Sequence, residues 1–135
     1  MTSSLPRILV IDDDKDCLQN LVAMLQEIGY SNVTSRFFSA DSFRACDFSV
    51  STYLPPLHEG MIIFLDEKMS TELSTCSGSD LRNYILQQSI HSKSLTFVST
   101  TDGDSHAWAE HHYTGKTDLP NEGGQNKLIS LLSKI

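Results

Sequence analysis

The sequence predicts an α/β protein in which a parallel sheet is covered by helices on both faces. Short aliphatic runs, such as residues 8–11 and 61–65, alternate with segments whose apolar residues have helical spacing. The runs are apolar throughout rather than at every second residue, which is typical of strands buried on both faces. Strand–helix alternation along the chain then indicates a parallel, doubly wound sheet.

Five strands and the helices between them can be placed along the chain. The predicted strands are residues 8–11, 32–38, 61–65 and 95–99, with a brief fifth at Tyr113–Thr114. The first helix carries Leu18 to Ile28 at helical spacing and is ended by Gly29. Further helices are predicted from 39 to about 50, from 79 to about 88 and from 104 to about 111. A terminal helix with Leu128, Leu131, Leu132 and Ile135 is predicted after Pro120 and the pair Gly123–Gly124.

Length and composition limit the classes of protein to which the chain can belong. Its 135 residues fit a single domain, residues 1–135. A net charge of -7 argues against direct binding to nucleic acid or to an anionic membrane. The 3 cysteines are widely spaced and form no CxxC pair, which favours a reducing cytosol. We find neither a signal peptide nor a run long enough to span a bilayer, and we expect a cytoplasmic protein.

Polar residues stand where several predicted strands end. Asp12 and Asp13 follow the first strand, Asp66 follows the third, Ser99 ends the fourth, and Lys116 follows the fifth. Carboxyl ends of parallel strands meet at one edge of a sheet, where ligands bind. Two carboxylates about 5 Å apart repel by roughly 3 kcal/mol at an effective dielectric constant near 20. A cluster of three carboxylates therefore needs a proton or a bound cation. Oxygen ligands at a site with open coordination positions suit Mg2+, with Mn2+ as a substitute.

Such a site could carry out phosphoryl transfer. A carboxylate such as Asp66 can act as a nucleophile and form an aspartyl phosphate, while the metal neutralises charge on the phosphoryl group. Lys116 would pair with the phosphoryl oxygens as a point charge. The hydroxyl of Ser99 could donate a hydrogen bond to one of them, although the neighbouring Thr100 or Thr101 could do so instead. Asp14 is expected to cap the following helix rather than to bind metal.

Four separated segments resemble response-regulator receiver domains. The first strand and acidic pocket of that family resemble ILVIDDDKD, and the third strand with the phosphoacceptor resembles MIIFLDEKM, with a Met three places after the Asp. The fourth strand, which ends in Thr or Ser, resembles LTFVST. The segment with the fifth strand resembles HHYTGKT, with an aromatic residue three places before the Lys. The resemblance implies a flavodoxin-like fold with five strands in the order 2-1-3-4-5.

The resemblance also implies a role for each matching residue. Asp66 becomes the phosphoacceptor and Lys116 the phosphate-binding lysine. Asp12 and Asp13 become the acidic pair, with Asp13 as the direct metal ligand, and the backbone carbonyl of Lys68 is the expected third protein ligand. Asp66 completes the set of metal ligands.

Two further residues, the partners and the output follow from the same resemblance. Ser99 becomes the switch hydroxyl, and Tyr113 is either the switch aromatic or a plain packed ring. A histidine kinase or a histidine phosphotransfer protein would donate the phosphoryl group, and a downstream protein would bind the switched surface. A homodimer could form on phosphorylation. The chain would be a stand-alone receiver that assists its own phosphorylation and dephosphorylation, rather than an enzyme.

Departures from the family pattern leave two alternatives. Ser70 and Thr117 stand where the family has proline, and the stretch from Ser99 to Lys116 is shorter than usual. These departures allow an interaction module that works without phosphorylation. A Mg2+-dependent phosphohydrolase with an aspartyl nucleophile is less favoured, because Lys68 stands where such enzymes need a second acid. The histidines 106, 111 and 112 are expected at a solvated helix end rather than in a metal site.

Overall fold

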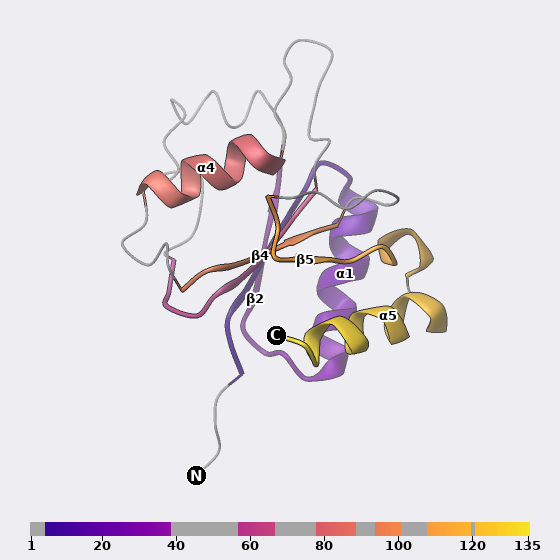
Figure 1. The fold of residues 1–135 in the computed structure, drawn as a ribbon. Coiled ribbons are helices and arrows are strands. Elements are labelled where there is room, and N and C mark those ends of the chain that lie inside the picture. The colour runs from indigo at the N-terminus through magenta and orange to yellow at the C-terminus, as the bar shows by residue number, and fades with distance from the viewer. Residues whose placement is uncertain (1–4, 39–56, 67–77, 89–93, 101–107, 120) are drawn as a thin grey trace.

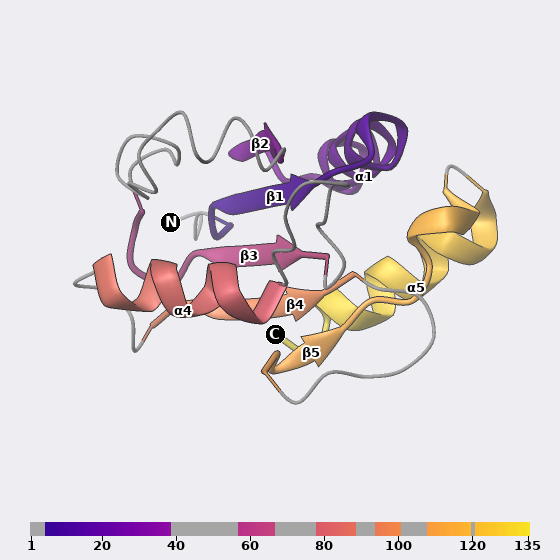
Figure 2. The same cartoon turned by 90° about the horizontal axis from the view of Figure 1, so that it is seen from above.

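The computed structural model describes residues 5–38, 57–66, 78–88, 94–100, 108–119 and 121–135. Within them, five parallel strands form one sheet in the order β2-β1-β3-β4-β5 (Figure 2). They are β1 (Ile8–Asp12), β2 (Val33–Phe37), β3 (Ile62–Leu65), β4 (Thr96–Ser99) and β5 (His111–His112). The predicted parallel sheet and the strand order implied by the resemblance are both confirmed.

Helices cover both faces of this sheet, also as predicted. Helices α1 (Lys15–Ile28) and α5 (Glu122–Leu132) lie on one face, and α4 (Gly78–Gln88) lies on the other (Figure 1). Each face has its own apolar cluster, and side chains alternate between the two along a strand. In β1, Ile8 and Val10 belong to the cluster under α1 and α5, and Leu9 and Ile11 belong to the cluster under α4. Burial on both faces explains why the strand is apolar throughout.

Helix α1 begins and ends where the sequence predicts. The Asp14 carboxylate accepts hydrogen bonds from the backbone N–H groups of Asp16 and Cys17, so this residue caps the helix. Gly29 has a φ of 130°, which ends the helix without the penalty that a side chain would cause. The capping role expected for Asp14 is confirmed.

The fifth strand was predicted two residues too late. It is His111–His112, and residues 108–110 before it are not helical, so the helix predicted to reach about His111 does not extend there. Pairing with β4 starts at Glu110, whose N–H donates to the Phe97 carbonyl and whose carboxylate accepts from the Phe97 N–H at 2.8 Å. A side chain thus supplies a hydrogen bond that strand backbone normally makes, which no alternation of apolar residues could reveal.

The C-terminal helix also differs from its prediction. Helix α5 starts at Glu122, contains both Gly123 and Gly124, and ends before Ile135. The two glycines therefore do not precede the helix, and Gly124 has a packing reason. A Cβ atom on Gly124 would lie 2.7 Å from the carbonyl oxygen of Gly115, so only glycine fits. Before α5 stands a short 3-10 turn, η1 (Lys116–Asp118).

Some predictions fall on residues that the structure does not describe. The helix expected from 39 to about 50 lies outside the described residues, as do residues 104–107 of the short helix. In the described ranges, no helix is both long enough and apolar enough to cross a bilayer.

Candidate phosphoryl-transfer and metal site

Three carboxylates meet at the carboxyl ends of two neighbouring strands. Asp12 is the last residue of β1, Asp13 follows it, and Asp66 directly follows β3. The two strands pair in register, with Ile11 opposite Leu65. As a result, one carboxylate oxygen from each acid lies within 4.8 Å of the others. The parallel sheet therefore brings Asp66 to Asp12 and Asp13, although more than fifty positions of the chain separate it from them.

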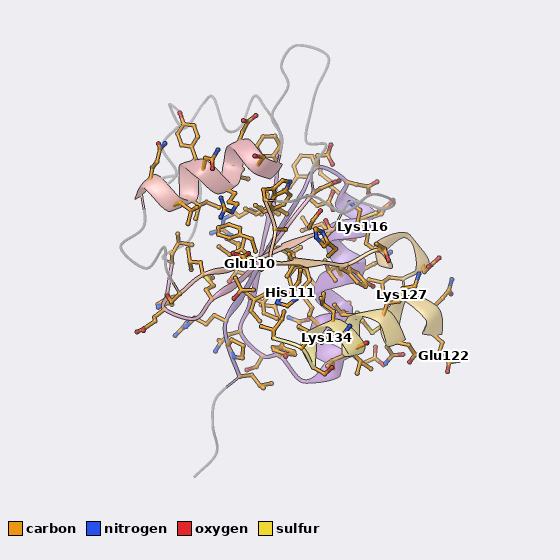
Figure 3. All side chains as sticks on the ribbon, in the orientation of Figure 1. Glu110, His111, Lys116, Glu122, Lys127 and Lys134 are labelled. Carbon is orange, nitrogen blue, oxygen red and sulfur yellow. The ribbon has the colours of Figure 1, made fainter. Side chains whose placement is uncertain are left out.

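Lys116 joins this cluster from the turn η1. Its Nζ atom donates to Asp12 Oδ2 at 2.9 Å and to Asp66 Oδ2 at 2.8 Å. Burial acts to lower the pKa of Lys116, but hydrogen bonds to Asp66 and Asp12 and their negative charges outweigh burial, so the pKa lies above its usual value. The lysine is thus a fixed positive charge. Figure 3 shows it at the end of the sheet, apart from Lys127 on α5 and from Lys134, which follows that helix.

The three acids differ in how tightly they are held. Asp12 is 1% exposed, and its Oδ1 accepts from the Asp14 N–H while its Oδ2 accepts from Lys116. Asp66 is 8% exposed, whereas Asp13 is only half-buried. Asp12 is therefore an anchor fixed on both oxygens, and Asp13 is the acid most open to an incoming ion.

The electrostatic balance of the cluster favours a cation. Burial, a hydrogen bond to Asp12 and the negative charges of Asp12 and Asp66 raise the pKa of Asp13 to about 6. One ammonium faces three carboxylates, so negative charge remains in excess once Asp13 ionises. Three hard oxygen donors suit Mg2+ or Mn2+ rather than metals that prefer sulfur or imidazole ligands. The residues present thus fit the predicted metal, with Asp12, Asp13 and Asp66 as the side chains that would hold it.

Two hydroxyls lie at the end of β4 beside this cluster. Ser99 and Thr100 are each 1% exposed, and neither hydroxyl has a hydrogen-bond partner within the described part of the chain. Leu65 is paired with Ser99, and the Thr100 N–H donates to the Leu65 carbonyl at 2.9 Å. The switch role expected for Ser99 stays a prediction, and Thr101 lies outside the described residues.

Tyr113 packs inside the protein rather than at its surface. It is 1% exposed and belongs to the apolar cluster under α1 and α5. Its hydroxyl donates to the Gly124 carbonyl at 2.8 Å. The ring is therefore packed in this structure, and the switch role expected for Tyr113 stays a prediction. His111 and His112, which were expected at a helix end, instead form β5.

The backbone carbonyl predicted as a metal ligand cannot be placed in the same way. Lys68 lies outside the described residues, so its role stays a prediction. Among the described residues, Asp12, Asp13 and Asp66 form the one group of three or more potential metal ligands.

Comparison with known proteins gives matches in structure but not in sequence. No family model and no curated protein sequence matches the chain. A response regulator receiver domain from Rhodospirillum rubrum superposes with a TM-score of 0.64 at 14% identity, covering 95% of this chain and 93% of that one. The chemotaxis protein CheY4 of Vibrio cholerae gives 0.61 at 18% identity, with coverages of 98% and 99%. The chain has the receiver-domain fold.

One further receiver structure bears on the site. The receiver domain of the histidine kinase CKI1 from Arabidopsis thaliana, solved in complex with Mg2+ and BeF3-, superposes with a TM-score of 0.54 at 15% identity. The match covers 96% of this chain and 88% of that domain. At such identities the likeness establishes the receiver fold, and the function has to be argued from the side chains.

Proposed function

We propose that this chain is the phosphoacceptor receiver of a two-component phosphorelay and takes a phosphoryl group from a phosphohistidine onto Asp66. The observation that carries the proposal is the cluster in which Lys116 bonds both Asp12 and Asp66. Asp13 completes this cluster at the carboxyl edge of a receiver-type sheet. A buried lysine that bridges two acids beside a third is costly to maintain for stability alone, which favours a functional reason for it.

The chemistry proposed for Asp66 is a direct displacement. A carboxylate oxygen of Asp66 forms a bond to phosphorus while the bond between phosphorus and the donor's imidazole nitrogen breaks. The imidazole leaves with the electron pair of that bond, and an acyl phosphate remains on Asp66. Lys116 lies against Asp66, so its positive charge is already in place for the phosphoryl oxygens.

A divalent cation completes the proposed site. Asp12, Asp13 and Asp66 would hold it, together with the Lys68 carbonyl that the resemblance implies. Bound Mg2+, or Mn2+ in its place, would offset the negative charge of the transferring group. The complex of the CKI1 receiver with Mg2+ and BeF3- supports this part of the proposal by analogy.

The proposed output is a change in a protein-binding surface rather than steady turnover. Phosphorylation shifts an existing conformational equilibrium, and a downstream protein reads the result. A histidine kinase or a histidine phosphotransfer protein is the proposed donor, since the CKI1 neighbour is the receiver of a histidine kinase. We place the chain in the cytoplasm, where such donors act.

Phosphotransfer is the decisive experiment. The protein is incubated with Mg2+ and either acetyl phosphate or a phosphorylated histidine phosphotransfer protein, and its intact mass is measured. We expect one added phosphoryl group on the wild type and none on Asp66→Asn. The proposal fails if the wild type gains no phosphoryl group from either donor, or if Asp66→Asn gains as much. Sustained hydrolysis of small phosphate esters would instead support the phosphohydrolase.

A phosphorylation-independent interaction module is the second candidate. It is favoured by Ser70 and Thr117, which replace the two prolines of the family pattern. The contacts of Lys116 weigh against it, because the lysine reaches both acids although no proline follows it. Partner binding that is unchanged in Asp66→Asn and by acetyl phosphate would favour the module.

A further inference from the structure

Strand β2 lies at one edge of the sheet, with β1 on its inner side (Figure 2). On that side the Asn32 carbonyl accepts from the Ile8 N–H at 2.9 Å, and the Phe38 N–H donates to the Asp12 carbonyl at 2.8 Å. Backbone groups along a parallel strand point to alternate sides, so the even-numbered residues face β1 and the odd-numbered ones face outward. No strand in the described part of the chain pairs with this outer edge.

The outward backbone groups are those of Val33 and Ser35 in the middle of the strand. Both N–H groups and the Val33 carbonyl have no hydrogen-bond partner among the described residues. The Ser35 carbonyl accepts from the Arg36 guanidinium at 3.0 Å. A charged side chain over an edge strand is one way in which proteins prevent indiscriminate pairing. The edge can therefore pair fully with another chain only when Arg36 turns away from this carbonyl.

A groove of about 540 Å³ runs between β2 and helix α1. Ser35 and Phe37 line it from the strand, and Leu18 and Val22 line it from the helix. The Phe37 side chain is 40% exposed, so part of its ring is open to solvent. Side chains alternate along a strand, so the odd-numbered residues that present backbone to the outer edge are also those that face α1. A further strand at this edge would place every second side chain over the groove.

The charge around the groove differs from that of the protein as a whole. Among the described residues that line the groove, Lys15 is the one that carries charge, and its ammonium lies 4.9 Å from the centre of the Phe37 ring. Arg36 adds a second positive charge at the edge. The whole chain has a net charge of -7, so a second copy would be repelled. A segment with an acidic side chain would instead be attracted to this positive border.

We propose that the outer edge of β2 and the adjoining groove bind an extended segment of a partner protein, in which apolar residues alternate with polar ones and one side chain is acidic. Its main chain pairs with Val33 and Ser35 and adds a strand to the sheet. Its apolar side chains fill the groove beside Leu18 and Val22. Its acid binds Arg36 and so exposes the Ser35 carbonyl for pairing. This binding does not require phosphoryl transfer.

A display library of random nine-residue peptides is the probe for this surface. Peptides are selected on the immobilised full chain, and the affinities of enriched peptides are measured by fluorescence anisotropy. We expect apolar residues at every second position and at least one acid in the enriched peptides. In the 15N-labelled protein, bound peptide should shift the amide signals of Val33 and Ser35 more than those of α5.

Two variants and a matched control test the binding mode. Ser35→Pro removes an outward N–H and leaves the hydrogen bonds to β1 in place, since proline is tolerated where an edge strand faces solvent. Ala23→Glu places a negative charge in the groove, which Ala23 also lines. Each should weaken peptide binding by about tenfold or more. Asn83→Glu adds the same charge at an exposed position of α4 and should change the affinity by less than about twofold.

Several results would overturn the proposal. Peptides with apolar residues at helical spacing would show that a helix occupies the groove. Peptides that bind Ser35→Pro and Ala23→Glu as tightly as wild type would place the contact elsewhere, and a library that yields no peptide specific for the wild type would exclude the site. Self-association of the wild type that Ser35→Pro abolishes would assign the edge to a second copy. Circular dichroism checks folding, and Ala23→Glu alone decides the test if the proline variant does not fold.

Discussion

Replacing Asp13 with asparagine should make the protein more stable at neutral pH. Asp13 lies beside Asp12 and Asp66, and its pKa rises from 3.8 to about 6 in the folded chain. A carboxyl group with a higher pKa in the folded than in the unfolded state binds its proton more tightly when folded. The free energy of unfolding therefore falls as pH rises from about 4 to above 6, because Asp13 then ionises in a site that is partly buried and already carries the negative charges of Asp12 and Asp66.

The size of the effect follows from the shift. At about 1.4 kcal/mol for each pKa unit, moving from 3.8 to about 6 corresponds to about 3 kcal/mol. Asp13 is partly open to solvent, and screening reduces this to about 1–2 kcal/mol. Asparagine carries no charge at any pH, so Asp13→Asn should be more stable than wild type by about that amount above pH 7. The difference should become small near pH 4.

Urea unfolding at pH 4, 5.5 and 7.5, with a chelator present, measures these free energies. Glu27→Gln is the matched control, because it removes one negative charge from an exposed position on α1 and should change stability by less than about 0.5 kcal/mol. A gain in Asp13→Asn that is the same at pH 4 and pH 7.5, or no gain at pH 7.5, would refute the reasoning. Adding Mg2+ should stabilise the wild type more than Asp13→Asn, since the variant lacks one proposed ligand.

Four further substitutions test the packing around the site by urea or thermal unfolding. Lys116→Met leaves two buried carboxylates without their counter-ion and should lower the free energy of unfolding by about 3 kcal/mol. Added Mg2+ should stabilise this variant more than it stabilises the wild type. A variant as stable as the wild type would contradict the ion pairing. Gly124→Ala forces a Cβ atom against the backbone of Gly115 and should cost about 1–3 kcal/mol. A Cβ atom on Gly123 would have no atom within 4 Å, so Gly123→Ala should instead raise the free energy of unfolding by about 0.5–1 kcal/mol. Equal effects of the two glycine substitutions would argue against the close contact at Gly124. Tyr113→Phe removes the hydroxyl bonded to α5 and should cost about 1 kcal/mol; an unchanged melting temperature would count against that bond.

The sequence predicts those parts of the fold that depend on burial and on local hydrogen bonds. Strands β1 and β3 are apolar throughout because both faces are covered, so their position could be predicted. Both ends of helix α1 could be predicted, because Asp14 and Gly29 act through hydrogen bonds to residues only a few positions away. The acid cluster followed from a geometric rule, since parallel strands that end in carboxylates bring them to one edge.

Long-range contacts explain what the sequence did not predict. Strand β5 is two histidines long, and its pairing begins with the side chain of Glu110, so it has no apolar signature. The face of the sheet that Ser99 and Thr100 each occupy depends on the register of β4 against β3, because a shift by one residue reverses which face a side chain occupies. Both features require knowledge of a partner strand.

The position of Lys116 shows how such a contact can replace a local motif. No proline follows the lysine, yet Nζ lies within hydrogen-bond distance of both acids. The residue before it, Gly115, packs against Gly124 so closely that a Cβ atom on either would lie about 3 Å or less from atoms of the other segment or of Tyr113. Gly124, which in the sequence resembles a helix breaker, therefore allows α5 to pack closely against the segment that leads into the turn η1. The first turn of α5 therefore packs against the backbone of the residue that precedes Lys116, and this long-range contact takes the place of a local proline in positioning the turn.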